Sequence, residues 1–235
     1  MREKTFDQTD AGWDEYYTSL ENPYGNKFKN EHKKYMFTHT WRNSVRVIEK
    51  YADINDGDKI LDAGGGWGRM TWGILENHNS LQVTVVDFQE SALKIGKELI
   101  GCQKGGNSIS WEVGNLESLN YPDSSFDRIY SSRVFQHLNS PEKGAAEIVR
   151  TLKTGGKFVI YIQNKLCPLN INYYSRVYTP SQVKSWFKDI RLSELHISTM
   201  DFCPTFIGSM QIEKTMEKMP VLNHFGGKVV LWGKK

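Results

Sequence analysis

From about residue 59 onwards, the chain alternates between short apolar runs rich in β-branched residues and longer segments with apolar residues at helical spacing. The apolar runs predict strands over residues 59–63, 81–86, 108–113, 126–131, 158–162, 192–198 and 228–232. The segments between them predict helices over residues 67–77, 91–100, 141–152 and 180–188. This order favours an α/β fold with a doubly wound, mostly parallel sheet, in which ligands bind at the carboxyl ends of the strands.

The first 52 residues have a different pattern, because they are rich in aromatic residues and read as helices. Between Tyr35 and Tyr51 the apolar residues recur at helical spacing. A turn at residues 55–58 then leads into the first strand. We therefore expect a helical N-terminal cap over residues 1–52 and a ligand-binding region over residues 53–235, both within one structural domain.

Composition and charge narrow the range of functions. The 235 residues include 30 basic and 27 acidic side chains, and the net charge of +3 does not by itself indicate nucleic-acid binding. No apolar run approaches the length of a membrane span, and the N-terminus lacks the apolar stretch of a signal peptide. We expect a soluble, cytoplasmic protein with no membrane and no nucleic-acid partner.

The cysteines, Cys102, Cys167 and Cys203, are far apart, which disfavours a disulfide framework or a structural zinc site.

The most informative segment is LDAGGGWGR at residues 61–69, where a strand leads through glycines into a helix. Glycine lets the backbone turn tightly and approach a ligand closely. The dinucleotide fingerprint G-x-G-x-x-G/A does not fit, because its sixth position is Arg69 or Thr71. Asp62 stands before the glycines, where it would repel a diphosphate and attract the ammonium and sulfonium of S-adenosylmethionine. An alternative role for Asp62 is to accept hydrogen bonds from the backbone amides of the turn.

Two later segments carry groups suited to the nucleoside part of such a ligand. Asp87 ends the second predicted strand, where a carboxylate accepts hydrogen bonds from ribose hydroxyls. Phe88 follows it and offers a ring to the adenine face, while Asn115 and Leu116 follow the third strand and offer amide groups to the adenine edge. A helix N-cap or a solvated loop acid is the alternative for Asp87.

Taken together, these segments resemble the class I S-adenosylmethionine-dependent methyltransferases. The resemblance covers residues 55–162 and includes LDAGGGWGR, VVD at 85–87, GNLESLNYPDSSFDRIYSS at 114–132 and EIVRTLKTGGKFVIY at 147–161. It implies a Rossmann-like, seven-stranded sheet with an antiparallel last strand, and S-adenosylmethionine as cofactor with S-adenosylhomocysteine as product. The cofactor-binding residues that it implies are Asp62, Gly64, Gly65, Gly66, Asp87, Asn115, Leu116, Ser132 and Arg133, to which the analysis of the residues adds Gly68 and Phe88. The family often has Asp at the position of Asn115.

Methyl transfer from a sulfonium depends mainly on positioning, and the sequence shows no cluster of metal ligands. His137, after the fourth strand, is the best-placed general base for a hydroxyl acceptor, since an ordinary histidine titrates near neutrality. A histidine that only packs or caps is the alternative.

The segment after the fifth strand is expected to contribute to acceptor binding, with Tyr174, Arg176 and Tyr178 as candidate contacts. Acidic residues are missing from residues 148–188, so we consider Arg176 and Lys165 as contacts to an anionic group on the acceptor. A solvated basic face is the alternative for these cations.

The sequence therefore predicts an enzyme that methylates oxygen or nitrogen of a small molecule, with carbon or sulfur less favoured. A methyltransferase for RNA or protein is an alternative, although the chain reads SSRVFQ where amino-group nucleic-acid methyltransferases have an Asn-Pro-Pro-Tyr type of motif. A protein that binds the cofactor or a partner without turnover and a dinucleotide-dependent oxidoreductase are further alternatives. We expect a monomer or a homodimer.

Overall fold

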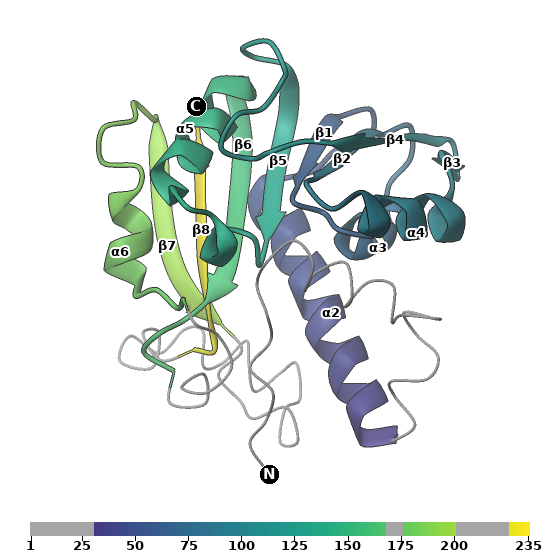
Figure 1. Ribbon diagram of the computed structural model, residues 1–235, viewed down its shortest axis with the longest axis horizontal. Helices are drawn as coiled ribbons and strands as arrows, with labels where there is room; N and C mark the ends of the chain where they lie inside the picture. Colours follow the sequence, from purple (N-terminus) through teal and green to yellow (C-terminus); the bar gives the residue numbers. More distant parts are fainter. Residues whose placement is uncertain (1–30, 168–175, 201–225) are drawn as a thin grey trace.

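The computed structural model describes residues 31–167, 176–200 and 226–235, with side chains except at residues 31–40 and 103–104. The helices are α2 (Glu31–Ala52), α3 (Arg69–Leu75), α4 (Glu90–Ile100), α5 (Pro141–Thr151), α6 (Pro180–Ser185) and the 3-10 helix η2 (Phe135–His137). The strands are β1 (Lys59–Ala63), β2 (Gln82–Asp87), β3 (Gln103–Lys104), β4 (Asn107–Val113), β5 (Phe126–Ser132), β6 (Leu152–Gln163), β7 (Glu194–Met200) and β8 (Lys228–Lys234). The strands form one sheet flanked by the helices (Figure 1).

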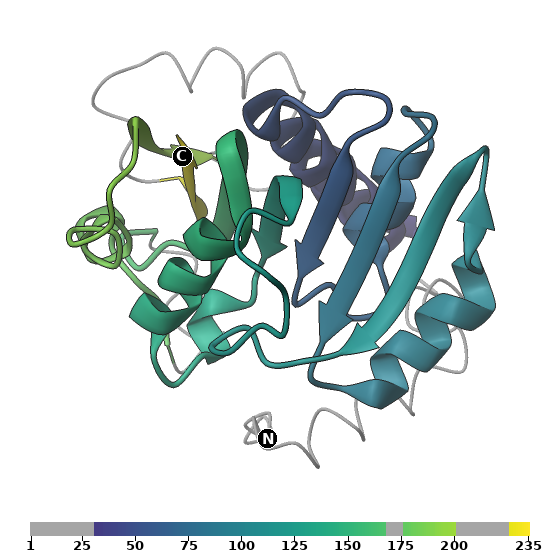
Figure 2. The ribbon, with the colours of Figure 1, turned by 90° about the horizontal axis from the view of Figure 1, so that it is seen from above.

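The strand order is β3-β4-β2-β1-β5-β6-β8-β7, with parallel pairing from β4 through to β6. Strand β8 is antiparallel to both of its neighbours, β6 and β7. Figure 2 shows the blue and teal strands β1, β2 and β4 side by side. This topology confirms the predicted Rossmann-like sheet of seven main strands with an antiparallel last strand. The order reverses between β1 and β5, so a ligand is expected at the carboxyl ends of these strands.

Two features of the sheet differ from the sequence prediction. The two-residue strand β3 pairs with β4 through a turn at Gly105 and Gly106, whose φ angles are 60° and 81°. A tight hairpin needs positive φ at both central residues, so the Gly-Gly pair is the signal for this strand. Strand β6 begins at Leu152 instead of residue 158, because the segment directly after α5 already pairs with β5 before a register shift.

Both faces of the sheet are covered by apolar side chains from the helices. One cluster packs Ile148 of α5 and Val183 of α6 against the sheet, and the other packs Ile48 of α2 and Ile74 of α3. Each of these side chains is at most 1% exposed, and each contributes about 1.5–3 kcal/mol through burial. With both faces covered, the strand ends are the parts of the sheet open to a ligand.

Helix α2 contains the helix predicted over residues 35–51. Its second half packs on the sheet through Val45, Ile48 and Ala52, and Trp41 Nε1 donates a hydrogen bond to the Arg69 carbonyl at 2.8 Å. Its first half extends past the carboxyl edge of the sheet (Figure 1). Residues 1–30 of the predicted cap lie outside the described residues, so the division of the chain at residue 52 stays a prediction.

Within the described ranges, no helix is both long enough and apolar enough to cross a membrane. Cys102 is an exposed free thiol and Cys167 a buried one, while Cys203 lies outside the described residues.

Candidate functional site

The glycine loop has the backbone conformation that its sequence predicts. Gly64, Gly66 and Gly68 have φ angles of 78°, 56° and 77°, which side-chain-bearing residues rarely adopt. The amides of Gly64 and Gly65 donate hydrogen bonds to the Val86 carbonyl at 2.7 and 3.1 Å, which ties the loop to the end of β2. A Cβ on Gly65 would lie 2.6 Å from the Asp62 Cγ, so this position requires glycine for steric reasons.

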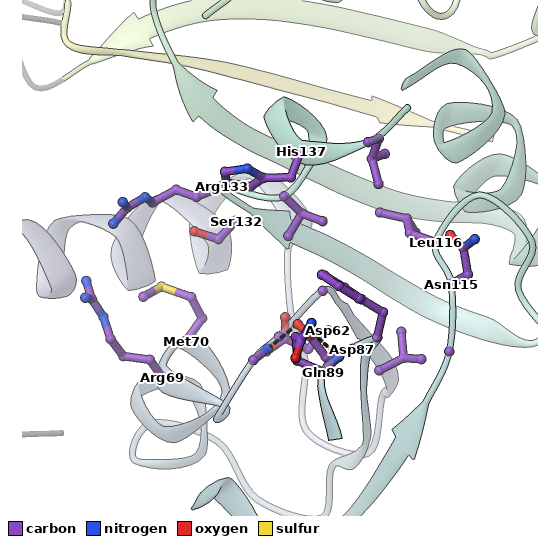
Figure 3. Close-up of a pocket in the computed structure, with 18 of the residues that line it drawn as sticks. Asp62, Arg69, Met70, Asp87, Gln89, Asn115, Leu116, Ser132, Arg133 and His137 are labelled. Carbon is purple, nitrogen blue, oxygen red and sulfur yellow. Dashed lines mark hydrogen bonds between the residues drawn. The ribbon is translucent and has the colours of Figure 1, made fainter. Parts of the chain in front are cut away.

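A cavity of about 560 Å³ opens beside this loop, at the carboxyl ends of the strands. Its volume is within the range of small-molecule sites. All of the predicted cofactor-binding residues except Gly68 line the cavity: Asp62, Gly64, Gly65, Gly66, Asp87, Phe88, Asn115, Leu116, Ser132 and Arg133. Figure 3 shows Asp62 and Asp87 close together between Met70 and Asn115. Gly68 is instead the N-cap of α3, where a Cβ would lie 2.6 Å from the ring of Trp111.

Asp62 is buried near the end of β1, and its Oδ2 accepts a hydrogen bond from Thr71 Oγ1 at 2.7 Å. Thr71 Oγ1 is also 2.9 Å from Tyr130 Oη, so the acid belongs to a buried polar chain. Burial raises the pKa of Asp62 to about 7, although the hydrogen bonds from Thr71 and Tyr130 oppose this shift. A cation placed beside the carboxyl group would favour its ionised form. The donor of this hydrogen bond is a hydroxyl group in α3 and not a backbone amide of the turn. The alternative role, in which Asp62 only accepts hydrogen bonds from amides of the turn, therefore does not account for the contact with Thr71.

Asp87 connects the end of β2 to the glycine loop. Its Oδ2 accepts from the Gly66 amide at 2.8 Å, and its Oδ1 accepts from the Gln89 amide at 3.0 Å. Burial raises the pKa of Asp87, and the hydrogen bonds from these amides oppose the shift. The N-cap of α4 is Gln89, so Asp87 is not the cap. A carboxylate has about four lone-pair sites, so two amide bonds leave capacity for ribose hydroxyls.

The part of the cavity predicted to bind adenine combines an exposed ring with two amide positions. The Phe88 side chain is 47% exposed, which is unusual for a large apolar residue and suits stacking with a flat ligand. Asn115 Oδ1 accepts a hydrogen bond from the Glu117 amide at 2.8 Å, so this oxygen shapes the loop. Leu116 is 5% exposed and anchors the loop in the core. The Asn115 Nδ2 is the atom of that side chain suited to donate to an adenine nitrogen.

His137 lines the cavity, but its environment differs from that of an ordinary histidine. Burial lowers its pKa to about 4, and the charges of Arg133 and Arg176 act in the same direction. At neutral pH the imidazole is therefore uncharged and is a weak proton acceptor. The titration near neutrality that favoured His137 as general base does not hold in this environment, and its catalytic role stays a prediction.

Two of the predicted acceptor contacts, Arg176 and Tyr178, are not among the described residues that line the cavity. Arg176 Nη1 donates to the carbonyl of Leu138, a lining residue, at 2.8 Å. Tyr178 packs edge-to-face on Trp186 with 4.9 Å between ring centroids. Tyr174 lies outside the described residues, so its role stays a prediction.

The cavity also contains residues that the sequence analysis does not predict as ligand contacts, among them Ser44, Arg69, Met70 and Lys228. Arg69 is the last residue of the LDAGGGWGR segment, so its place beside the glycine loop could have been predicted from the motif. Lys228 begins an antiparallel strand, and such a strand starts at the edge where its parallel neighbours end. Ser44 has no comparable signal, because its position depends on how α2 packs.

Residues 61–160 match the family model described as "Methyltransferase domain". A curated relative, the ubiquinone/menaquinone biosynthesis C-methyltransferase UbiE of Hydrogenovibrio crunogenus, is 28% identical over 108 residues, 46% of this chain and 42% of the relative. The chain spans less than half the length of the curated relatives it matches.

Solved structures show the same fold. An S-adenosylmethionine-dependent methyltransferase from Aquifex aeolicus has a TM-score of 0.65 and 14% identity, covering 94% of this chain and 97% of that chain. A Haemonchus contortus phosphoethanolamine N-methyltransferase, described in complex with phosphomonomethylethanolamine and S-adenosylhomocysteine, has a TM-score of 0.63 and 18% identity. It covers 85% of this chain and 57% of the other.

The sheet order, the glycine loop and the matched family model agree with one another. Over residues 61–160 they bear out the predicted resemblance to the class I, Rossmann-like S-adenosylmethionine-dependent methyltransferases. A methyltransferase domain also agrees with S-adenosylmethionine as the predicted cofactor.

Proposed function

We propose that this chain transfers a methyl group from S-adenosylmethionine to a small-molecule acceptor. The observation that carries the proposal is the pair of buried acids, Asp62 and Asp87, that flank one glycine loop in a single cavity. A diphosphate in this place would face two carboxyl groups of low solvent exposure, which is electrostatically unfavourable. A ligand with an ammonium, a sulfonium and two ribose hydroxyls complements both acids.

The residues present fit this cofactor. Asp62 and the loop at residues 64–66 would hold the amino-acid part, and Asp87 would accept hydrogen bonds from the ribose. Phe88 and Asn115 would contact the adenine. When bound, the cofactor supplies an activated methyl group on sulfur. The protein's own contribution is to position the acceptor in line with this group and to exclude water, for which the apolar side chains of Val134 and Leu138 line the cavity.

The acceptor atom is a separate part of the proposal. Oxygen and nitrogen are the atoms favoured by the sequence analysis, and the name of a relative, a ubiquinone/menaquinone biosynthesis C-methyltransferase, adds carbon as a candidate. A neutral His137 is compatible with acceptors that need no strong base. The cavity volume of about 560 Å³ supports a small acceptor.

The binding part of this proposal is tested by thermal shift with S-adenosylhomocysteine and with NAD. We expect S-adenosylhomocysteine to raise the melting temperature and NAD to leave it unchanged, since only a ligand of the folded state stabilises it. Asp87→Ala should weaken the shift, whereas Asp189→Asn, a change in an acid whose side chain is 84% exposed, should not. Stabilisation by NAD without stabilisation by S-adenosylhomocysteine would overturn the proposal.

The transfer itself is tested with S-adenosylmethionine labelled on the methyl group. Purified protein is incubated with quinols, phenols, amines and carboxylic acids, and label in each small molecule is measured. We expect acceptor-dependent transfer. Label appearing in RNA or protein alone would support those alternatives, and cofactor binding without transfer to any class would support a binding protein.

A further inference from the structure

The charged residues that line the cavity are separated by sign. Asp62 and Asp87 lie at the carboxyl ends of β1 and β2, and Glu117 lies in the loop after β4, so these acids share one half of the sheet. The cations are Arg69 at the start of α3, Arg133 after β5 and Lys228 at the start of β8. Figure 3 shows Arg69 and Arg133 extending towards the same side of the cavity, away from Asn115 and Leu116. The cavity therefore has an acidic end and a cationic end.

Lys228 lies at the far edge of this cationic end. It is the first residue of β8 and pairs with Gln163, the last residue of β6, so it lies at the carboxyl edge of the sheet. Strands β5 and β6 separate β8 from β1. Three strand spacings amount to about 14 Å, which places Lys228 well away from the end of β1, where Asp62 lies.

The Lys228 side chain is held in a defined position. It is 8% exposed, and its Nζ donates a hydrogen bond to Tyr161 Oη at 3.1 Å. The same Tyr161 oxygen accepts a hydrogen bond from Ser44 Oγ of α2 at 3.0 Å. The ammonium also lies 5.0 Å from the centroid of the Tyr161 ring, a distance at which a cation and an aromatic face attract each other. This arrangement lowers the entropy that Lys228 loses when a ligand binds.

Tyr161 also fixes the second cation of this end. Its backbone carbonyl accepts a hydrogen bond from the Arg133 amide at 2.6 Å. Arg133 has a φ of 65°, a left-handed conformation that is unfavourable for a side chain with a Cβ. Such strain persists where the surrounding structure enforces it, and it concentrates at ligand sites. One buried tyrosine thus positions Lys228 through its side chain and Arg133 through its backbone.

We propose that Lys228, positioned by Tyr161, binds an anionic group, a carboxylate or a phosphate, on the methyl acceptor. This inference rests on the proposed function, because it assigns the acidic end of the cavity to the cofactor. The cofactor also carries a carboxylate, and Arg69 and Arg133 are nearer to the glycine loop than Lys228. The distance of Lys228 from β1 assigns it to the acceptor.

The test is calorimetry on protein saturated with S-adenosylhomocysteine, using benzoate and inorganic phosphate as probes and benzamide as the neutral comparison. We expect at least one anion to bind and benzamide to bind more weakly or not at all. Lys228→Met should weaken anion binding about tenfold, equivalent to about 1.4 kcal/mol. The matched control, Lys184→Met on the exposed side of α6, should bind the anion as the original protein does.

Tyr161→Phe tests the positioning role, because it removes the hydroxyl that Lys228 contacts and keeps the ring. We expect a smaller loss of anion affinity, about threefold, with an unchanged affinity for S-adenosylhomocysteine that shows the fold is intact. The same anion affinity in Lys228→Met and Lys184→Met would overturn the inference.

The cofactor carboxylate is examined separately with 5′-methylthioadenosine, which lacks the amino-acid part. If Lys228→Met weakens S-adenosylhomocysteine but not 5′-methylthioadenosine, Lys228 contacts the cofactor and the assignment to the acceptor is wrong. If S-adenosylhomocysteine does not bind at all while Lys228-dependent anion binding persists, the proposed function fails and the anion site stands.

Discussion

The affinity for S-adenosylmethionine should depend on pH through the carboxyl group of Asp62. Burial raises the pKa of this group to about 7 in the ligand-free protein. At pH 6 about one tenth of Asp62 is ionised, and at pH 7.5 about three quarters is ionised. A bound cation favours the carboxylate, so its pKa falls in the complex. If the pKa in the complex is well below 6, the affinity at pH 7.5 exceeds that at pH 6 by about eightfold, or about 1.2 kcal/mol.

The assay is isothermal titration calorimetry with S-adenosylmethionine at the two pH values, in buffers of different ionisation enthalpy to count released protons. We expect tighter binding at pH 7.5 and proton release near pH 6. Asp62→Asn is the control, and its weaker affinity should change less than twofold between the two pH values. His137, with a pKa lowered to about 4, does not titrate in this window. An affinity that is unchanged or higher at pH 6 would refute the reasoning.

The remaining predictions concern stability and catalysis. In the absence of ligand, Asp62→Asn should be more stable than the original protein at pH 8 in urea unfolding: an acid whose folded-state pKa is raised to about 7 from 3.8 loses stability as the pH rises between these values, on the order of 4 kcal/mol at most. Gly65→Ala should lower stability by about 1–3 kcal/mol and reduce S-adenosylhomocysteine binding, whereas Gly57→Ala, with open space around its Cβ, carries only the cost of its positive φ; equal losses of binding would count against the steric argument. Arg150→Lys should lower the free energy of unfolding by about 1–3 kcal/mol, because Arg150 bonds the Glu147 carboxylate and the carbonyls of residues 119 and 121 at once; an unchanged denaturation midpoint would contradict this. Once an acceptor is known, His137→Gln should reduce kcat less than about tenfold and leave the pH profile between 6 and 8 unchanged, and the loss of an acidic limb in that range would show that His137 acts as the base.

The half of the site that holds the predicted cofactor contacts could be inferred from the sequence because its signals are local. Strand β1 has the predicted bounds of residues 59–63, and the glycines follow it directly. Asp62 and Asp87 lie at or next to the last residues of strands that pair in register, Asp62 with Val85 and Ala63 with Val86. Parallel strands that end together bring such residues into one cavity, so the order of elements along the chain was sufficient.

Only part of the cationic end could be inferred in the same way. Arg133 was predicted from its place after the fourth strand, but Lys228 and Ser44 come from distant segments. Lys228 reaches the cavity through an antiparallel strand, and Ser44 reaches it through the packing of α2. The basic and aromatic composition of the segment after the fifth strand favoured Arg176 and Tyr178 as acceptor contacts. In the structure Arg176 donates a hydrogen bond to a backbone carbonyl, and Tyr178 packs on Trp186. Sequence proximity to a strand end does not determine which way a side chain points.

The electrostatic environments of His137 and Asp62 could not be predicted from the sequence either. His137 follows the fourth strand as expected, yet burial and two neighbouring arginines lower its pKa. Asp62 was expected to be a negative charge, and its burial makes it a carboxyl group that ionises near neutral pH. Burial is the largest cause of both effects, and it depends on how the whole chain packs.

The central claim is that the cavity between Asp62 and Asp87 holds the methyl donor, and a crystal structure with S-adenosylhomocysteine tests it most directly. We expect the ribose hydroxyls at the Asp87 carboxylate, the amino group on the Asp62 side of the glycine loop and the adenine beside Phe88. Electron density for the ligand at a different place, or clear density for this cavity without the ligand in crystals grown at saturating concentration, would contradict the account.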